Sequence, residues 1–498
     1  MGSRHLPRLT SLAAVAVAVL TAAGCGTTVP SAQLAGAGTA SDGLSSVPLA
    51  TQAPGATSGT TPQVPGTVSG PGGSTPTGGD GANGTSVGES RPPMTVAPVG
   101  GTVEVGFFVV KDLGPATKAL GVDGLATGNA TNQVRASVAL LNSRGGLNGK
   151  VVKPVILEQD ATQNAQTQYQ AACSLFFDDH KVAAVVGWGL LPVVQSCAMQ
   201  HHVPYVTSGN RTTSSAEISR YPLLAIPSQL DLRRAVATLV PSLSVQGYFK
   251  PRTATEIVRI GLIYNEDNDF AQVPALVSEQ LKRLGLSLTD KQSMPSPDDT
   301  SRVPAASNAG ASAVLRFSSA RITHVISISK SGQAMAYFGI AAQNQAYYPQ
   351  FGLSSLELPA SQRTVITARQ LQGARGIGWL PSWDVPTSAQ PPLNANATAC
   401  VAALKKAGED MSLAATRGSA LGTCDGTLLL GAAWKRRALT APDFLAGLGD
   451  LGSTYAPAVT LADDFGSRRD GASAVRPMAF QAACDCFAYT GAQVPAAQ

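Results

Sequence analysis

The stretch VAAVVG at residues 182–187 is a short, fully apolar run, which predicts a buried β-strand. The segment LPVVQSCAMQ at 191–200 follows it and predicts a helix, and VPYVTS at 203–208 predicts another strand. Strands that alternate with helices in this way predict a parallel sheet with helices on both faces. The fold class indicated is therefore α/β.

The same alternation extends outward on both sides of this stretch. Before it, we expect strands at 102–110 and 151–157 and helices at 131–143 and 166–178. After it, a second series contains strands at 257–264 and 323–328 and helices at 273–284 and 332–343. Two series of roughly 120 residues each indicate two lobes, and ligands of such sheets bind outside the carboxyl ends of the strands.

The first 25 residues read as an export signal. Arg4 and Arg8 form a basic head, residues 11–20 are apolar, and small residues precede Cys25. This order of a basic head, a short apolar core and a small-residue exit is typical of a secretory leader rather than of a spanning helix.

Residues 26–99 differ in composition from the rest of the chain. They are rich in Gly, Pro, Ser, Thr and Ala, contain no aromatic residue, and carry only four charges. Such a segment cannot bury enough apolar surface to offset its chain entropy, so we expect a disordered tether. A flexible coil of this length has a typical span of about 45–50 Å.

Charge and motifs exclude several functions. The formal net charge is only +5, of which the leader contributes two, so a nucleic-acid partner is not indicated. After residue 25 no apolar run reaches the roughly 18 residues of a spanning helix. Residues 327–330 spell S-x-x-K, but the chain has neither S-D-N nor K-T-G, so the match is attributed to chance. We therefore predict a protein that is not an enzyme and needs no cofactor.

Six cysteines beyond the leader suit an oxidising compartment. They allow 15 pairings, of which 173–197 and 400–424 are the local ones, and 484–486 is a further, strained choice. A zinc site built from Cys197, His201 and His202 is the alternative, although it lacks a fourth ligand. The disulfide candidates are Cys173, Cys197, Cys400, Cys424, Cys484 and Cys486.

Several motifs, in one order, carry a family resemblance. They are NSRGGLNG at 142–149, EQD at 158–160, the VAAVVG run, VPYVTSG at 203–209, RIGLIY at 259–264, RDG at 469–471 and the stretch 478–487. With these motifs the chain resembles the type I periplasmic solute-binding proteins of the branched-chain amino-acid and amide class, which are leucine-binding-protein-like receptors of ABC importers. The resemblance covers residues 101–490. The end of the leader similarly resembles a bacterial lipobox, which implies that Cys25 is acylated.

The resemblance implies a two-lobed fold in which each lobe is a doubly wound parallel sheet. Three crossovers would form the hinge, near Pro227, at 373–381 and at 455–465. Lobe one would comprise 101–226 plus 377–455, lobe two 227–376 plus 456–490, and 491–498 would be a tail.

The family's ligand contacts map onto turns at the carboxyl ends of strands. We expect ligand contacts from Trp188, Gly189, Leu190, Ser208, Gly209, Asn210, Asp269, Phe270, Lys330, Ser331 and Ser354. Core packing of Trp188 and ordinary turn chemistry at 208–210 are the alternatives. Ser354 or Ser355 stands where amino-acid receptors place a glutamate for the ammonium group, and Glu357 is displaced. An unmodified branched-chain amino acid is therefore a doubtful ligand, because an unpaired buried charge is costly.

The function implied is that of an exported, monomeric receptor, lipid-anchored to the outer face of the cell membrane. It would close around a small polar organic molecule, amino-acid or amide-like, and deliver it to the permease and ATPase subunits of an ABC importer. The alternative is a ligand sensor of the same fold that signals to a membrane partner.

Overall fold

The computed structural model describes residues 100–115, 125–189, 191–209 and 211–498. The leader, Cys25, the tether, Leu190 and Asn210 lie outside the described residues. All described residues belong to one compact unit. In the part of the chain that is described, no helix is long and apolar enough to cross a membrane.

The first sheet is fully parallel, with the strand order β2-β1-β3-β4-β5. Its strands are β1 (Gly100–Val110), β2 (Lys150–Gln159), β3 (Val185–Gly187), β4 (Tyr205–Thr207) and β5 (Leu224–Ala225). The helices that connect them are α2 (Ala130–Ser143), α3 (Ala165–Cys173) with the π-helical turn η1 (Ser174–Asp179), α4 (Pro192–Gln200) and α5 (Ser215–Arg220). We call this sheet with its helices lobe one.

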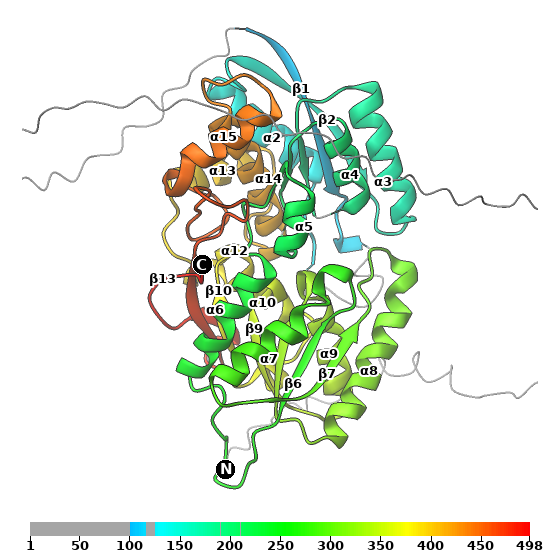
Figure 1. Ribbon diagram of the computed structural model, residues 1–498, viewed down its shortest axis with the longest axis vertical. Coiled ribbons are helices and arrows are strands. Elements are labelled where there is room, and N and C mark those ends of the chain that lie inside the picture. Colours follow the sequence, from blue (N-terminus) through cyan, green and yellow to red (C-terminus); the bar gives the residue numbers. More distant parts are fainter. Residues whose placement is uncertain (1–99, 116–124, 190, 210) are drawn as a thin grey trace, which may run out of the picture. The chain divides into compact units, whose positions relative to one another are not determined.

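Helices from much later in the chain complete lobe one. They are α13 (Ala395–Lys406), α14 (Ala414–Ala433) and α15 (Ala441–Leu451). Leu429 of α14 and Phe444 of α15 share one apolar core with Phe107 of β1 and Val206 of β4. The opposite face of the same sheet buries a second core against α3 and α4. Figure 1 shows these two groups of helices on either side of β1.

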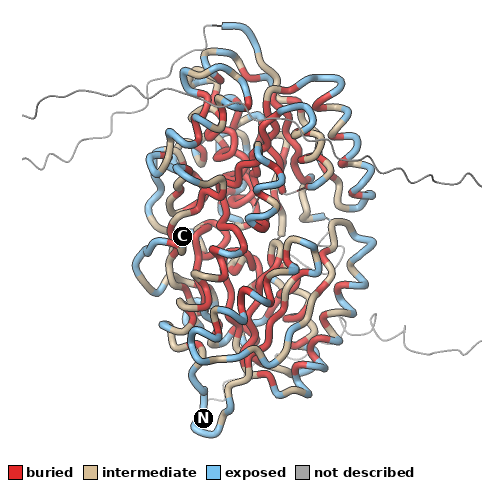
Figure 2. The backbone as a smooth tube through the Cα atoms, viewed as in Figure 1, coloured by how far each residue is buried: buried red, intermediate tan, exposed pale blue. Residues whose placement is uncertain are grey.

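The second sheet has a parallel centre and an antiparallel edge, in the order β12-β11-β10-β9-β8-β6-β7, with β13 paired to β11. Its strands are β6 (Ile260–Asn265), β7 (Leu288–Met294), β8 (His324–Ile328), β9 (Gln350–Ser354), β10 (Arg375–Gly378), β11 (Ala474–Gln481), β12 (Cys486–Tyr489) and β13 (Val494–Pro495). Its longer helices are α6 (Leu232–Val245), α7 (Val273–Arg283), α8 (Val303–Ser319) and α9 (Gln333–Asn344), and the short ones are α10 (Pro359–Gln362), α11 (Ala368–Leu371) and α12 (Pro381–Asp384). We call this sheet with α6–α11 lobe two. Figure 2 shows the buried residues in the interior and the exposed residues at the periphery.

Most of the predicted elements are confirmed, and local chemistry explains their ends. The helix α2 buries Val134, Val138 and Leu141 at the predicted spacing. It ends at a turn in which Gly146 has φ +65°, and a Cβ there would lie 1.9 Å from the carbonyl oxygen of Lys150. Only glycine fits that turn, which brings the chain back into β2.

Three differences from the sequence predictions have physical causes. The strand β7 was missed because its residues, LTDKQSM, are mostly polar and half-exposed at the edge of the sheet. The predicted helix 166–178 is α3 followed by a π-helical turn. Lobe two is not purely parallel, because β11 enters from lobe one and then forms a hairpin with β12.

Three segments connect the lobes and lie side by side. They follow β5, β10 and α15. The backbone of Ile226 donates to the oxygen of Arg469 at 2.7 Å and accepts from Gly471 at 2.9 Å, and Leu461 donates to the oxygen of Trp379 at 3.2 Å. We call this bonded set the hinge. The lobe boundaries given above remain a proposal.

Candidate ligand-binding site

Direct contacts join the carboxyl-end loops of the two sheets. Nη1 of Arg211, which follows β4, lies 3.3 Å from Oδ1 of Asp298, which follows β7. Thr213 Oγ1 donates to Asp269 Oδ2 at 2.9 Å, and the backbone nitrogen of Thr300 donates to the oxygen of Ala161 at 3.2 Å. The loops at the carboxyl ends of the strands of both lobes therefore meet at one interface, which we call the cleft after the rule for ligand sites of parallel sheets.

Arg211 lies across the turn that follows β3. A Cβ on Gly189 would come within 2.8 Å of Cδ of Arg211, so the glycine makes room for the arginine stem. The hydroxyl of Tyr205 donates to the carbonyl oxygen of Gly189 at 2.7 Å and fixes that turn. The Arg211 side chain is only 10% exposed, and its Nε is buried without a hydrogen-bond partner among the residues that the structure describes. A buried N–H of this kind favours an acceptor from a ligand.

Lobe two presents a lysine and two carboxylates to the same place. Nζ of Lys330 lies 3.4 Å from Asp298 Oδ1 and 3.5 Å from Asp267 Oδ1. Burial alone would raise the pKa of Asp298, but the charges of Arg211 and Lys330 outweigh it and hold that pKa below the usual value. All three ion-pair distances exceed the 2.7–2.9 Å of well-formed charge-assisted hydrogen bonds. The ion pairs between these groups are therefore weaker than well-formed ones.

Several of the predicted residues lie at this cleft. Lys330 and Asp269 make the contacts just described. Trp188 and Gly189 form the turn beneath Arg211, and Ser208 and Gly209 form the neighbouring turn. A Cβ on Gly209 would lie 1.6 Å from the carbonyl oxygen of Trp188, so these two turns are in contact. Whether these residues touch a ligand remains a proposal.

Other predicted residues have different surroundings. Phe270 is 1% exposed and belongs to an apolar core that also contains Val273 and Val277 of α7. Ser354 is fully buried, and its hydroxyl oxygen accepts from the backbone nitrogen of Leu356. Ser331 adopts a left-handed φ of 56° next to Lys330. The structure does not bring Phe270 or Ser354 to the charged group at the cleft.

The sequence reasoning missed Arg211, Asp298 and Tyr169. Arg211 stands within the polar run that follows the strand at 203–208, so its position offered a signal. Asp298 follows the unpredicted strand β7, so no sequence signal indicated it. Burial raises the pKa of Tyr169, and the charge of Asp298 acts in the same direction.

The Glu357 side chain is hydrogen-bonded within lobe two. Its carboxylate accepts from the backbone nitrogen of Ser329 at 2.7 Å and from the Ser329 hydroxyl at 2.6 Å, and the residue is fully buried. Burial raises its pKa to about 7. Glu357 thus stabilises the turn that carries Lys330.

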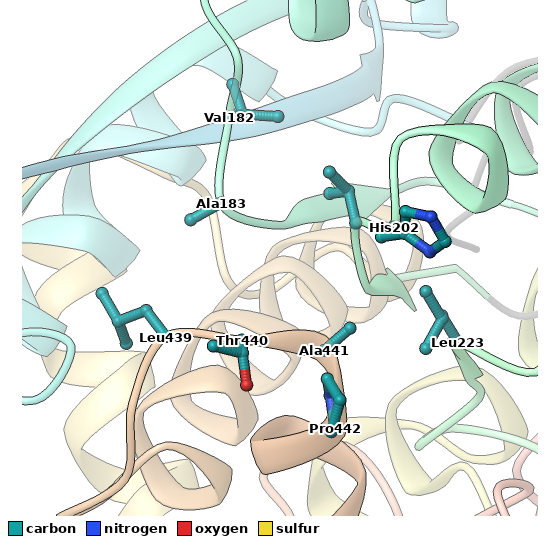
Figure 3. Close-up of a pocket in the computed structure, with 9 residues that line it drawn as sticks. Val182, Ala183, His202, Leu223, Leu439, Thr440, Ala441 and Pro442 are labelled. Atoms are coloured by element: carbon teal, nitrogen blue, oxygen red, sulfur yellow. The ribbon is translucent and has the colours of Figure 1, made fainter.

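A cavity on lobe one lies away from the cleft. It has a volume of about 490 Å³ and is lined by residues at the amino ends of β3, β4 and β5 and at the start of α15. Figure 3 shows that Val182, Ala183, Leu223 and Leu439 give it mostly apolar walls. It lies at the edge of the sheet opposite to the strand ends that ligands of such folds use.

The cysteines lie close together in three pairs. The Sγ atoms are at bonding distance for Cys173–Cys197, Cys400–Cys424 and Cys484–Cys486. The pairing of Cys197 with Cys173 removes the zinc alternative. Within the described ranges, no cluster of three or more His, Cys, Asp or Glu side chains could hold a metal ion.

Comparison with known proteins defines the class. Residues 121–484 match the family model described as periplasmic binding protein, so the chain belongs to that family. Its members are solute-binding receptors and not enzymes. A comparison with curated proteins finds no match.

Solved structures share the fold at low sequence identity. A substrate-binding protein of an ABC transporter from Aeropyrum pernix has a TM-score of 0.59 at 13% identity, covering 80% of this chain and 96% of its own. A solute-binding protein from R. palustris in complex with 4-hydroxybenzoate has a TM-score of 0.57 at 13% identity, covering 80% and 97%. A branched-chain amino acid receptor from Streptococcus pneumoniae in complex with isoleucine has a TM-score of 0.52 at 13% identity, covering 76% and 96%.

Proposed function

We propose that this chain is an extracytoplasmic receptor that closes around a small polar organic molecule and delivers it to an ABC permease and its ATPase. The observation that carries the proposal is the meeting of Arg211 with Asp298 across the cleft, beside Lys330. Groups of both lobes that converge on one point can be bridged by one ligand, and such bridging lowers the free energy of the closed form.

The charged groups at the cleft indicate the chemical class of the ligand. The Nε of Arg211, which has no partner among the described residues, and the neighbouring Lys330 suit an acceptor such as a carboxylate or an amide oxygen. Two of the structural relatives are in complex with 4-hydroxybenzoate and isoleucine, and both of these ligands carry a carboxylate. The Glu357 carboxylate is hydrogen-bonded to Ser329, so we do not expect it to pair with the ammonium group of a ligand. We therefore propose an amino-acid-like or amide-like acid in preference to free leucine.

Recovery of the native ligand tests this function. The full-length chain is purified without added solutes and denatured, and the released small molecules are identified by mass spectrometry. We expect one dominant species near one equivalent, which restores the thermal stability of the ligand-stripped protein when it is added back. If no species is released and no carboxylate, amide or amino acid raises the melting temperature, the receptor function is wrong.

The anchor is a second proposal, and it rests on the sequence at 21–25. We propose that Cys25 is acylated and that residues 26–99 hold a monomeric binding unit away from the outer face of the membrane. Cys25→Ser should release the protein into the soluble fraction, because the leader would no longer end in a lipid-modified residue. Fractionation followed by immunoblotting measures this. A Cys25→Ser protein that stays with membranes contradicts the anchor and leaves the receptor function untouched.

A further inference from the structure

The third pair of cysteines lies at the surface, in the turn of residues 482–485 that joins β11 to β12. Cys484 is exposed and Cys486 is half-buried. By contrast, Cys400 and Cys424 are both 0% exposed, between α13 and α14. A thiol has to reach a sulfur atom in order to attack a disulfide, so access favours reaction at the third pair.

The third pair also encloses the shortest loop. The other two pairs each span 24 positions in the sequence, whereas Cys484 and Cys486 are 2 positions apart, with Asp485 between them. A disulfide stabilises a fold mainly by restricting the unfolded chain, and this gain grows with the length of the enclosed loop. Asp485 has a φ of 51°, in the left-handed region that is uncommon for residues other than glycine. The bond therefore contributes little to folding, and opening it would free Asp485 from a constrained conformation.

Other contacts hold the hairpin next to this turn. Phe480 of β11 pairs with Phe487 of β12 through the backbone, and their rings pack edge to face with centroids 5.5 Å apart. Nε of Arg363 donates to Oδ1 of Asp485 at 2.6 Å, and Nη2 of Arg363 donates to Oδ2. These contacts do not depend on a covalent bond between the cysteines. The hairpin can therefore keep its register when that bond is opened.

We propose that Cys484 and Cys486 form a thiol–disulfide exchange site that dithiols reduce reversibly, which is a property beyond the proposed receptor function. In reduction, one thiolate of the dithiol attacks Sγ of Cys484. The bond to Cys486 breaks, and its electron pair goes to Sγ of Cys486, which takes up a proton. The second thiolate of the dithiol then attacks the first sulfur of the dithiol and releases Cys484, which is protonated in turn. The dithiol is oxidised to a disulfide, and the cysteine pair gains two electrons and two protons.

Reduction of the native protein by dithiothreitol tests the proposal. The air-oxidised full-length protein is incubated with dithiothreitol without denaturant, and free thiols are trapped with N-ethylmaleimide at successive times. Peptide mass spectrometry measures the label on each cysteine. We expect Cys484 and Cys486 to be labelled about tenfold faster or more than Cys400 and Cys424, because the exposed pair is the accessible one. Glutathione disulfide, added after the reductant is removed, should close the pair again and protect both cysteines from later labelling.

Two results of this labelling overturn the proposal. One is an equal rate for the exposed pair and for the buried pair Cys400–Cys424. The other is complete labelling of Cys484 and Cys486 before any dithiothreitol is added, since the two cysteines would then form no disulfide. The rates are measured on the wild-type protein alone and without any ligand, so they do not depend on the receptor function or on the folding of a variant.

Paired serine variants separate a reactive bond from a structural one. Changing both Cys484→Ser and Cys486→Ser should leave the midpoint of thermal unfolding within about 1 °C of the wild type. The matched change of Cys400→Ser with Cys424→Ser should lower the midpoint by about 3 °C or more, because that bond closes a longer loop. An equally large loss in both paired variants would make Cys484–Cys486 a structural disulfide and overturns the proposal.

Discussion

Asp470→Asn is expected to lower the free energy of unfolding by about 3–5 kcal/mol, because it leaves the Arg234 guanidinium buried without its counter-charge. The Nη1 of Arg234 lies 2.5 Å from Asp470 Oδ2, and both side chains are only 6% exposed. The other nitrogens of Arg234 donate to the carbonyl oxygens of Ala497 at 2.9 Å and Ala472 at 3.0 Å. Those carbonyls hold the guanidinium in place, so it cannot swing out to water when the carboxylate is gone.

The same carboxylate connects two hinge segments. Asp470 Oδ2 also accepts from the backbone nitrogen of Asp231 at 2.9 Å, at the start of α6. Urea unfolding of the full-length chain measures the loss. Glu279→Gln removes an ion pair of the exposed kind, with Arg283 at 65% and Glu279 at 52% exposure, and should cost about 0–1 kcal/mol. A loss for Asp470→Asn no larger than that of this control contradicts the prediction.

The buried strands could be predicted from sequence because their signal is local. VAAVVG contains only apolar residues and glycine, THVISI contains Val325, Ile326 and Ile328, and both β3 and β8 are fully buried. The helix that contains Val134 and Val138 likewise shows its buried face in its own spacing. The strand β7 shows no such pattern, since an edge strand has one neighbour and tolerates polar residues.

The site could be predicted only in part, because its chemistry depends on pairs that are distant in sequence. Arg211 and Asp298 are 87 positions apart, and the sequence around one residue does not indicate that it contacts the other. Lys330 was found because it directly follows a strong strand signal. Phe270 also follows such a signal, but sequence does not tell which way a turn residue points, and its ring enters the core.

Arg211→Gln should weaken binding of a carboxylate ligand by about 30-fold or more, as expected when one partner of a buried charge contact is removed. The reason lies in the arrangement of the Arg211 side chain, which is 10% exposed, packs against the Gly189 turn and has an Nε without a partner among the described residues. Its planar edge matches a carboxylate with two parallel hydrogen bonds, and glutamine cannot reproduce that match. Calorimetry with the recovered ligand, or with 4-hydroxybenzoate if it binds, gives the affinity.

A loss of affinity alone would not separate recognition from closure, since Arg211 also reaches Asp298 across the cleft. The informative quantity is the ratio of affinities for an acid and its amide, for example 4-hydroxybenzoate and 4-hydroxybenzamide. A weaker closure lowers both affinities equally and leaves the ratio unchanged, whereas loss of carboxylate recognition brings the ratio towards one. Arg302→Gln removes a cation that is 49% exposed and paired with Glu266, so it should preserve both the affinity and the ratio. A wild-type acid-to-amide ratio that persists in Arg211→Gln would show that this arginine fastens the lobes without recognising the ligand.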